Sequence, residues 1–110
     1  MSEYEAMIAA LEATGIPFRE DGWHDERTPH PAAPYGEYAI DGGDELRGDD
    51  HRQLASLSGT VDLYVKGDGL DLKSQVEEAL DGCMISWELN SRQYEPDTRL
   101  THYEWLFEVL

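Results

Sequence analysis

The sequence predicts an α+β fold, with two helices packed on a mostly antiparallel sheet of four to five strands. Three observations support this: a strand–helix–strand pattern between residues 56 and 89, an amphipathic helix near the N-terminus, and a long alternating segment at the C-terminus. In chain order the predicted elements are α-β-β-β-α-β-β. A chain of 110 residues has the length of one domain, so we expect a single domain over residues 1–110.

The centre of the chain changes its hydrophobic period twice. Residues 57–65 alternate apolar and polar side chains, which is typical of a strand with one buried face. After a glycine-containing turn, Leu72, Val76 and Leu80 recur every fourth residue and indicate a helix with one apolar stripe. The period returns to two in residues 83–89, so a second strand follows the helix.

The N-terminal segment predicts a capped helix followed by a short strand. Ser2 and Glu5 have the spacing of a capping box, in which each side chain accepts a hydrogen bond from the other residue's backbone N–H. Apolar side chains then recur at helical spacing until Gly15 ends the helix, and these are Tyr4, Met7, Ile8 and Leu11. Pro17 prevents a helix from continuing, and the extended segment 16–19 suits an edge strand.

The segment from residue 20 to residue 34 has no regular period and is rich in proline, as irregular or functional loops are. Trp23 stands in this loop, and two placements are open for its side chain. It either packs on the core or stays exposed as an interface anchor. We expect it in the core, because large aromatic side chains near a core usually join it.

Two hairpins are predicted around the central helix. Residues 35–40 form a strand, and the glycine-rich, acidic segment 41–50 is an exposed connection, so that residues 35–66 form one long hairpin. The last strand spans residues 100–110 and pairs with the strand at 83–89, after a turn signalled by a Pro-Asp pair. Four large side chains are expected to share its buried face: Tyr103, Trp105, Phe107 and Val109.

The strongest signal in the composition is a formal net charge of −16, from 24 acidic and 8 basic residues. Phosphate binding needs clustered Lys and Arg, so we expect no sequence-specific binding of nucleic acid. Docking on an anionic membrane is disfavoured for the same reason. The charge fits three interpretations: plain solubility, a surface that nucleic acid passes without binding, or a mimic of nucleic acid.

No constellation of residues indicates a cofactor, a metal or an enzyme. The candidate metal ligands are His24 with Asp25 and Glu26, and His51 with Asp49 and Asp50. Neither group has a specific ligand spacing, and the acidic segment 41–50 lacks the pattern of a calcium-binding EF-hand loop. No nucleophile elbow or phosphate-binding glycine loop is present in the sequence. The single cysteine, Cys83, is expected as an inert residue on the buried face of a strand.

In this order and spacing, the elements resemble those of the small tail terminator or tail completion proteins of long-tailed bacteriophages and prophages. The resemblance runs from Tyr4 to the C-terminus and rests on several segments together. These are Thr14–Phe18, the aromatic loop at Trp23, Pro34–Tyr38, the acidic turn with Asp49 and Asp50, Val61–Tyr64, Val76–Leu80 and Phe107–Val109.

The resemblance implies a structural virion protein at the tail end or neck, assembled in the host cytoplasm. In that family a compact α+β subunit forms a hexameric ring, which caps the tail tube, ends its growth and provides the surface that joins the head. The implied partners are other copies of the chain, the tail tube protein and the head–tail connector proteins. The family has no catalytic residue, so the resemblance implies none here.

Contacts in such a ring are expected at the aromatic loop and the acidic turn, because two long hairpins leave strand edges and loop tips to be covered. The candidate interface residues are Trp23, His24, Tyr35, Asp41, Asp44, Glu45, Arg47, Asp49 and Asp50.

Three other functions remain open. The first is a head-side connector, or head completion protein, of the same particle, and the sequence separates it poorly from a terminator. An acidic DNA-mimic inhibitor would need its acids on one face like phosphates, whereas here they are spread over predicted helices, loops and strands. A hydrolase is the least favoured alternative.

Overall fold

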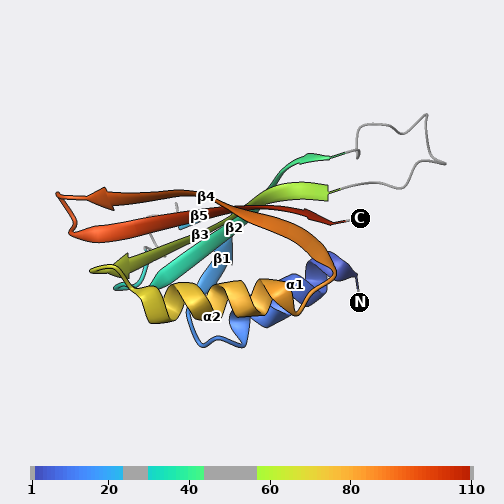
Figure 1. Cartoon of the computed structure of the whole chain (residues 1–110), viewed down its shortest axis with the longest axis horizontal. Coiled ribbons are helices and arrows are strands. Elements are labelled where there is room, and N and C mark those ends of the chain that lie inside the picture. The colour runs from blue at the N-terminus through green and yellow to red at the C-terminus, as the bar shows by residue number, and fades with distance from the viewer. Residues whose placement is uncertain (1, 24–29, 44–56, 110) are drawn as a thin grey trace.

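The computed structural model describes residues 2–23, 30–43 and 57–109. These residues form two helices and a five-stranded, mostly antiparallel sheet, which confirms the predicted fold class and element order (Figure 1). The elements are α1 (Glu3–Glu12), β1 (Phe18–Glu20), β2 (Tyr35–Gly43), β3 (Leu57–Lys66), α2 (Leu70–Asp81), β4 (Ile85–Glu95) and β5 (Leu100–Val109). Neither described helix is long and apolar enough to cross a membrane.

The strands lie in the order β1-β2-β3-β5-β4, so β3 and β5 are central and β1 and β4 are the edges. The two predicted hairpins are confirmed, because β2 pairs with β3 and β4 pairs with β5, both antiparallel. β3 also pairs with β5 along its whole length, from Leu57 opposite Val109 to Lys66 opposite Leu100. Among the described strands, β1 and β2 are the only pair that runs parallel.

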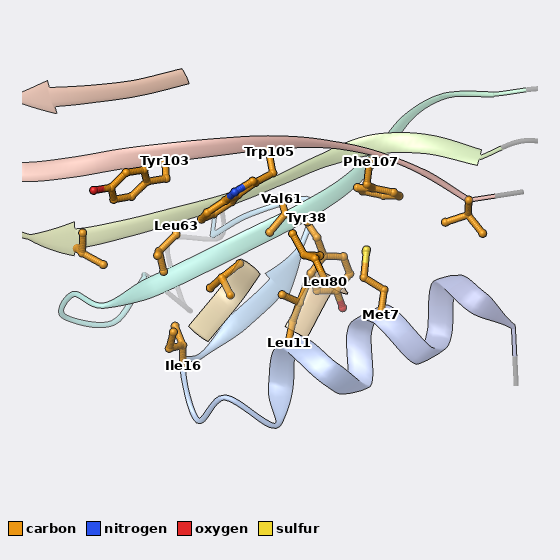
Figure 2. Packing of buried hydrophobic residues seen from close by; sticks show 13 residues of the cluster. Met7, Leu11, Ile16, Tyr38, Val61, Leu63, Leu80, Tyr103, Trp105 and Phe107 are labelled. Carbon is orange, nitrogen blue, oxygen red and sulfur yellow. The ribbon is translucent and has the colours of Figure 1, made fainter. Parts of the chain in front are cut away.

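Both helices lie on the same face of the sheet, and no described element covers the other face (Figure 1). The core is the layer between the helices and the sheet, and every second residue of β3 and β5 points into it (Figure 2). Its buried members are Met7, Leu11, Ile16, Tyr38, Val61, Leu63, Val65, Val76, Leu80, Tyr103, Trp105, Phe107 and Val109. The predicted buried face of the last strand is therefore confirmed.

Hydrogen bonds connect the central strand β5 to the helix layer. The indole Nε1 of Trp105, which is fully buried, donates to Glu77 Oε2 of α2 at 3.0 Å. Lys73 lies one turn earlier on α2, and its Nζ is 3.1 Å from the same carboxylate oxygen. The hydroxyl of Tyr103 donates to the carbonyl oxygen of Asp68 at 2.5 Å, just before α2 begins. The polar atoms of these aromatic side chains thus have partners, as buried polar atoms require.

Two strands are longer than the sequence predicts. β4 continues past Leu89 to Glu95, where a connection was expected, because a register shift between Leu89 and Ser91 interrupts the apolar alternation at Asn90. β2 likewise continues to Gly43, so Asp41 lies in a strand and not in the exposed connection. A second register shift, between Ile40 and Gly42, accompanies this extension.

Cys83 lies in the short connection between α2 and β4, and not within a strand as predicted. It is partly buried against the core, and its Sγ donates to the carbonyl oxygen of Ala79 at 3.3 Å. Burial and the nearby charge of Glu3 raise the pKa of the thiol, so that the protonated form is favoured.

Replacing Phe107 by Ala tests the two faces of β5. Phe107 is 3% exposed, and Leu106 beside it is 36% exposed on the opposite face. We expect Phe107→Ala to lower the free energy of unfolding by about 3–5 kcal/mol, because the truncation leaves a cavity in the core. Leu106→Ala, the matched control, is expected to have a much smaller effect. Denaturant melts of both variants measure this, and equal losses would contradict the assignment of faces.

Candidate functional site on the open sheet face

The face of the sheet opposite the helices, here called the open face, carries a row of four stacked rings. Tyr35, Tyr64 and His102 lie directly opposite one another on β2, β3 and β5, and His30 stacks on the outer side of Tyr35. The ring centroids are separated by 4.5 Å, 4.8 Å and 4.3 Å from His30 to His102, with interplanar angles of 15–16°. These four residues are the aromatic row.

Strand geometry explains this row. Residues directly opposite on neighbouring strands point to the same face, and their side chains lie about 5 Å apart, which is close to the stacking distance of rings. Tyr35 is only 7% exposed although no described element covers the open face. Its neighbours in the row, His30 and Tyr64, cover its two ring faces. Stacking within the row therefore accounts for the burial of Tyr35 on this face.

A second row, two residues further along each strand, consists of three carboxylates. Glu37 of β2 lies opposite Asp62 of β3, and Asp62 lies opposite Glu104 of β5. Neighbouring strands are about 4.8 Å apart, so the three acidic side chains stand side by side across the centre of the sheet. Asn90, at the register shift in β4, donates to Glu104 Oε1 at 2.7 Å. Glu37, Asp62 and Glu104 are the acidic row.

The two rows meet at His102, whose Nε2 lies 2.7 Å from Asp62 Oδ1. Burial alone would lower the pKa of His102. The hydrogen bond to Asp62 and the charges of Asp62, Glu95 and Glu104 outweigh that effect and raise the pKa above its usual value. Burial and the surrounding acids also raise the pKa of Tyr64, which keeps its hydroxyl protonated.

The chemistry offered by the open face is recognition by carboxylates and aromatic rings. Carboxylate oxygens accept strong hydrogen bonds from cationic donors, and tyrosine contributes apolar area together with a hydroxyl. Within residues 2–23, 30–43 and 57–109, no group of three His, Cys, Asp or Glu side chains is arranged to hold a metal ion.

The structure brings only one of the predicted interface residues into these rows, namely Tyr35. Trp23 is half-buried outside the hydrophobic core, so the expectation that it joins the core is wrong. Its indole Nε1 donates to the carbonyl oxygen of Gly36 at 3.0 Å, and the guanidinium of Arg19 lies 5.5 Å from its ring centroid. These two contacts hold the side chain beside β1 and β2.

Asp41 is exposed near the end of β2, away from the acidic row. The remaining candidates lie outside the described residues: His24, Asp44, Glu45, Arg47, Asp49 and Asp50. Their expected role at an interface stays a prediction.

Sequence reasoning missed most of the two rows. Alternation in the sequence places Asp62, Tyr64 and His102 on outward faces, but it does not show which strands are neighbours. The pairing of β3 with β5, which are separated by a helix and a strand, is what brings Tyr64 to His102 and Asp62 to Glu104.

A second feature of the surface is the edge strand β4, which has 11 residues. Its first half directs Ile85, Trp87 and Leu89 toward the helix face, where Ile85 and Trp87 pack at the margin of the core. Leu89 remains 39% exposed, and Met84, just before the strand, is more exposed still. The outer side of β4 has no strand neighbour among the described residues.

Replacing Asp62 by Asn tests the electrostatic balance at His102. Without the carboxylate, the hydrogen bond and the charge of Asp62 no longer raise the pKa of His102, while burial still lowers it. We therefore expect this pKa to fall below its wild-type value, which itself lies above the usual value of about 6.5. A pKa raised in the folded state stabilises the fold below about pH 6.5, and that gain is lost as pH rises through the folded pKa. The stability difference between wild type and Asp62→Asn is therefore expected to be larger at acidic pH.

The measurement is an NMR titration of the His102 ring, combined with denaturant melts below about pH 6.5 and above the pKa of His102 in the folded protein. Glu37→Gln is a control in the same row that leaves the His102–Asp62 contact in place. Identical His102 titrations in wild type and Asp62→Asn would contradict the assignment.

Comparisons with known proteins add no family to this description. No protein-family model matches the chain, and no curated protein is significantly similar to it.

Proposed function

We propose that the protein is a structural subunit that assembles through the β4 edge into a closed ring, and that this ring caps the tail tube of a long-tailed phage. The main observation in support of this assembly is the edge strand β4, which is long and partly apolar. The hexameric ring and its place on the tail come from the resemblance in the sequence.

The two edges of the sheet differ in their suitability for assembly. β1 has three residues and follows Pro17, and short strands and prolines are common means of protecting a sheet edge. β4 has 11 residues, and its first half directs a row of apolar side chains to the helix face. Its register shift and its charged residues hinder pairing with another strand more in the second half of β4 than in the first.

A ring follows if the β4 edge contacts a different patch on the neighbouring subunit. Such head-to-tail contacts repeat around a circle and close when the rotation between subunits permits. The formal charge of −16 opposes assembly, because acidic subunits repel one another at long range. Salt screens this repulsion to within about 10 Å at 0.1 M, so we expect assembly to strengthen as salt rises.

An acidic ring also suits the passage of DNA. A channel with negative walls repels phosphate groups and lets a duplex move without binding. A head-side connector would use the same kind of ring, and the part of the particle to which the ring attaches distinguishes the two roles.

Replacing Leu89 by Lys tests the edge. A lysine placed on an edge strand blocks the approach of another strand or apolar surface, so we expect Leu89→Lys to remain monomeric. Leu70→Lys is the matched control, because Leu70 is 56% exposed at the start of α2, away from the β4 edge. Light scattering after gel filtration, at about 1 M salt where screening extends to about 3 Å, measures the mass.

Wild type and Leu70→Lys are expected to reach the mass of a hexamer of the 12.5 kDa subunit, and Leu89→Lys is not. A wild-type protein that is monomeric at every salt concentration and also on tail tubes would contradict the proposal. So would equal assembly of the Leu89→Lys variant.

The role in the particle is tested by removing the gene from the phage genome that carries it. We expect tails of irregular length that fail to join heads, visible by electron microscopy. Normal infectious particles without this protein would contradict the terminator function, and capped tails with open heads would favour the head-side connector.

A further inference from the structure

Acidic residues outnumber basic residues on the open face. Besides the acidic row, the register of β4 with β5 places Glu88 and Glu95 on this face. The described strands place two lysine or arginine residues there, and both lie at its margins, while His102 at the centre is paired with Asp62. Arg19 is in the edge strand β1, and Lys66 is the last residue of β3. The centre of the open face is therefore negative, and its charge complements a basic surface.

The aromatic row makes this face more selective than a solvated acidic surface. Tyrosine is enriched among residues that dominate binding energies, and side chains already held in place lose little entropy on binding. Tyr35 and Tyr64 are held by stacking within 4.8 Å of each other. Leu106, 36% exposed, lies two residues beyond Glu104 and adds an apolar contact on the other side of the acidic row.

Arginine fits this combination better than lysine. Its planar guanidinium forms paired hydrogen bonds with a carboxylate, and it stacks on or lies against aromatic rings. Here the carboxylates of Glu37 and Glu104 flank Asp62 in one row, with rings on the adjacent row. An extended segment with arginines at alternate positions carries them on one side about 6.6 Å apart, and the long arginine side chains span the difference to carboxylates that lie about 4.8 Å apart on neighbouring strands.

We propose that the open face docks an arginine-bearing segment of a different protein, with guanidinium groups on the acidic row and apolar contacts along the aromatic row and Leu106. A second copy of this chain is a poor occupant, because both surfaces would carry the same excess of negative charge. Nucleic acid is excluded by the same sign of charge. The docking goes beyond the proposed ring and does not use the β4 edge.

The experiment compares two double variants that remove the same number of charges. Glu37→Gln with Glu104→Gln neutralises two members of the acidic row and leaves the His102–Asp62 contact intact. Glu12→Gln with Glu78→Gln neutralises two exposed acids on the helices instead. The probes are capped eight-residue peptides of alternating Arg and Gly, or alternating Lys and Gly, titrated by calorimetry at physiological salt.

We expect the open-face pair to weaken binding of the arginine peptide by about tenfold or more, and the helix pair by about twofold or less, because only the former loses charge-assisted hydrogen bonds. The arginine peptide is expected to bind wild type more tightly than the lysine peptide. Thermal melts of both double variants establish that they are folded.

If both double variants bound the arginine peptide equally more weakly than wild type, the binding would be explained by long-range attraction alone, and the proposal would be overturned. It would also be overturned if neither double variant weakened binding. Equal affinity of wild type for the arginine and lysine peptides would overturn the claim that the acidic row recognises guanidinium groups in particular. Loss of self-association in the open-face pair would show that the occupant is a second copy. Leu89→Lys should bind the arginine peptide like wild type, so that failure of ring assembly and failure of this docking are distinguishable.

Discussion

The antiparallel register of β3 with β5 is the constraint on which the rest of the structure depends. Val61 lies opposite Trp105 on the helix face, and Tyr64 lies opposite His102 on the open face. Because side chains alternate along a strand, a slip of one residue would move both sets to the wrong side. The core and the two rows are therefore consequences of a single pairing between strands that are distant in the sequence.

The core determines this register, and the acidic row is tolerated because of it. Like charges directly opposite each other cost on the order of 0.2–1 kcal/mol per pair. Full burial of one large apolar side chain contributes about 1.5–3 kcal/mol, and β3 and β5 together bury seven such residues. The hydrogen bond from Trp105 to Glu77 further fixes α2 over the same strands. The contacts of His102 with Asp62 and of Asn90 with Glu104 offset part of the repulsion within this row.

Periodicity in the sequence was sufficient for the elements and their buried faces, because each strand needs one apolar side and each helix one stripe. It failed where backbone geometry changes locally: the register shift at Asn90 hides the second half of β4. It misplaced Trp23, whose hydrogen-bond partner is the backbone of Gly36, 13 residues away. It also missed the pairing of Tyr64 with His102, since outward-facing residues carry no signal of which strand lies beside them.

Assembly through β4 is tested most directly by hydrogen–deuterium exchange below and above the salt concentration at which the protein self-associates. Exchange reports local opening and solvent contact of each backbone amide. We expect the outward amides of β4 between Ile85 and Leu89 to become protected on assembly, while α2 exchanges as before. Unchanged exchange in β4, with protection appearing on another element, would contradict the assignment of this edge as the assembly surface.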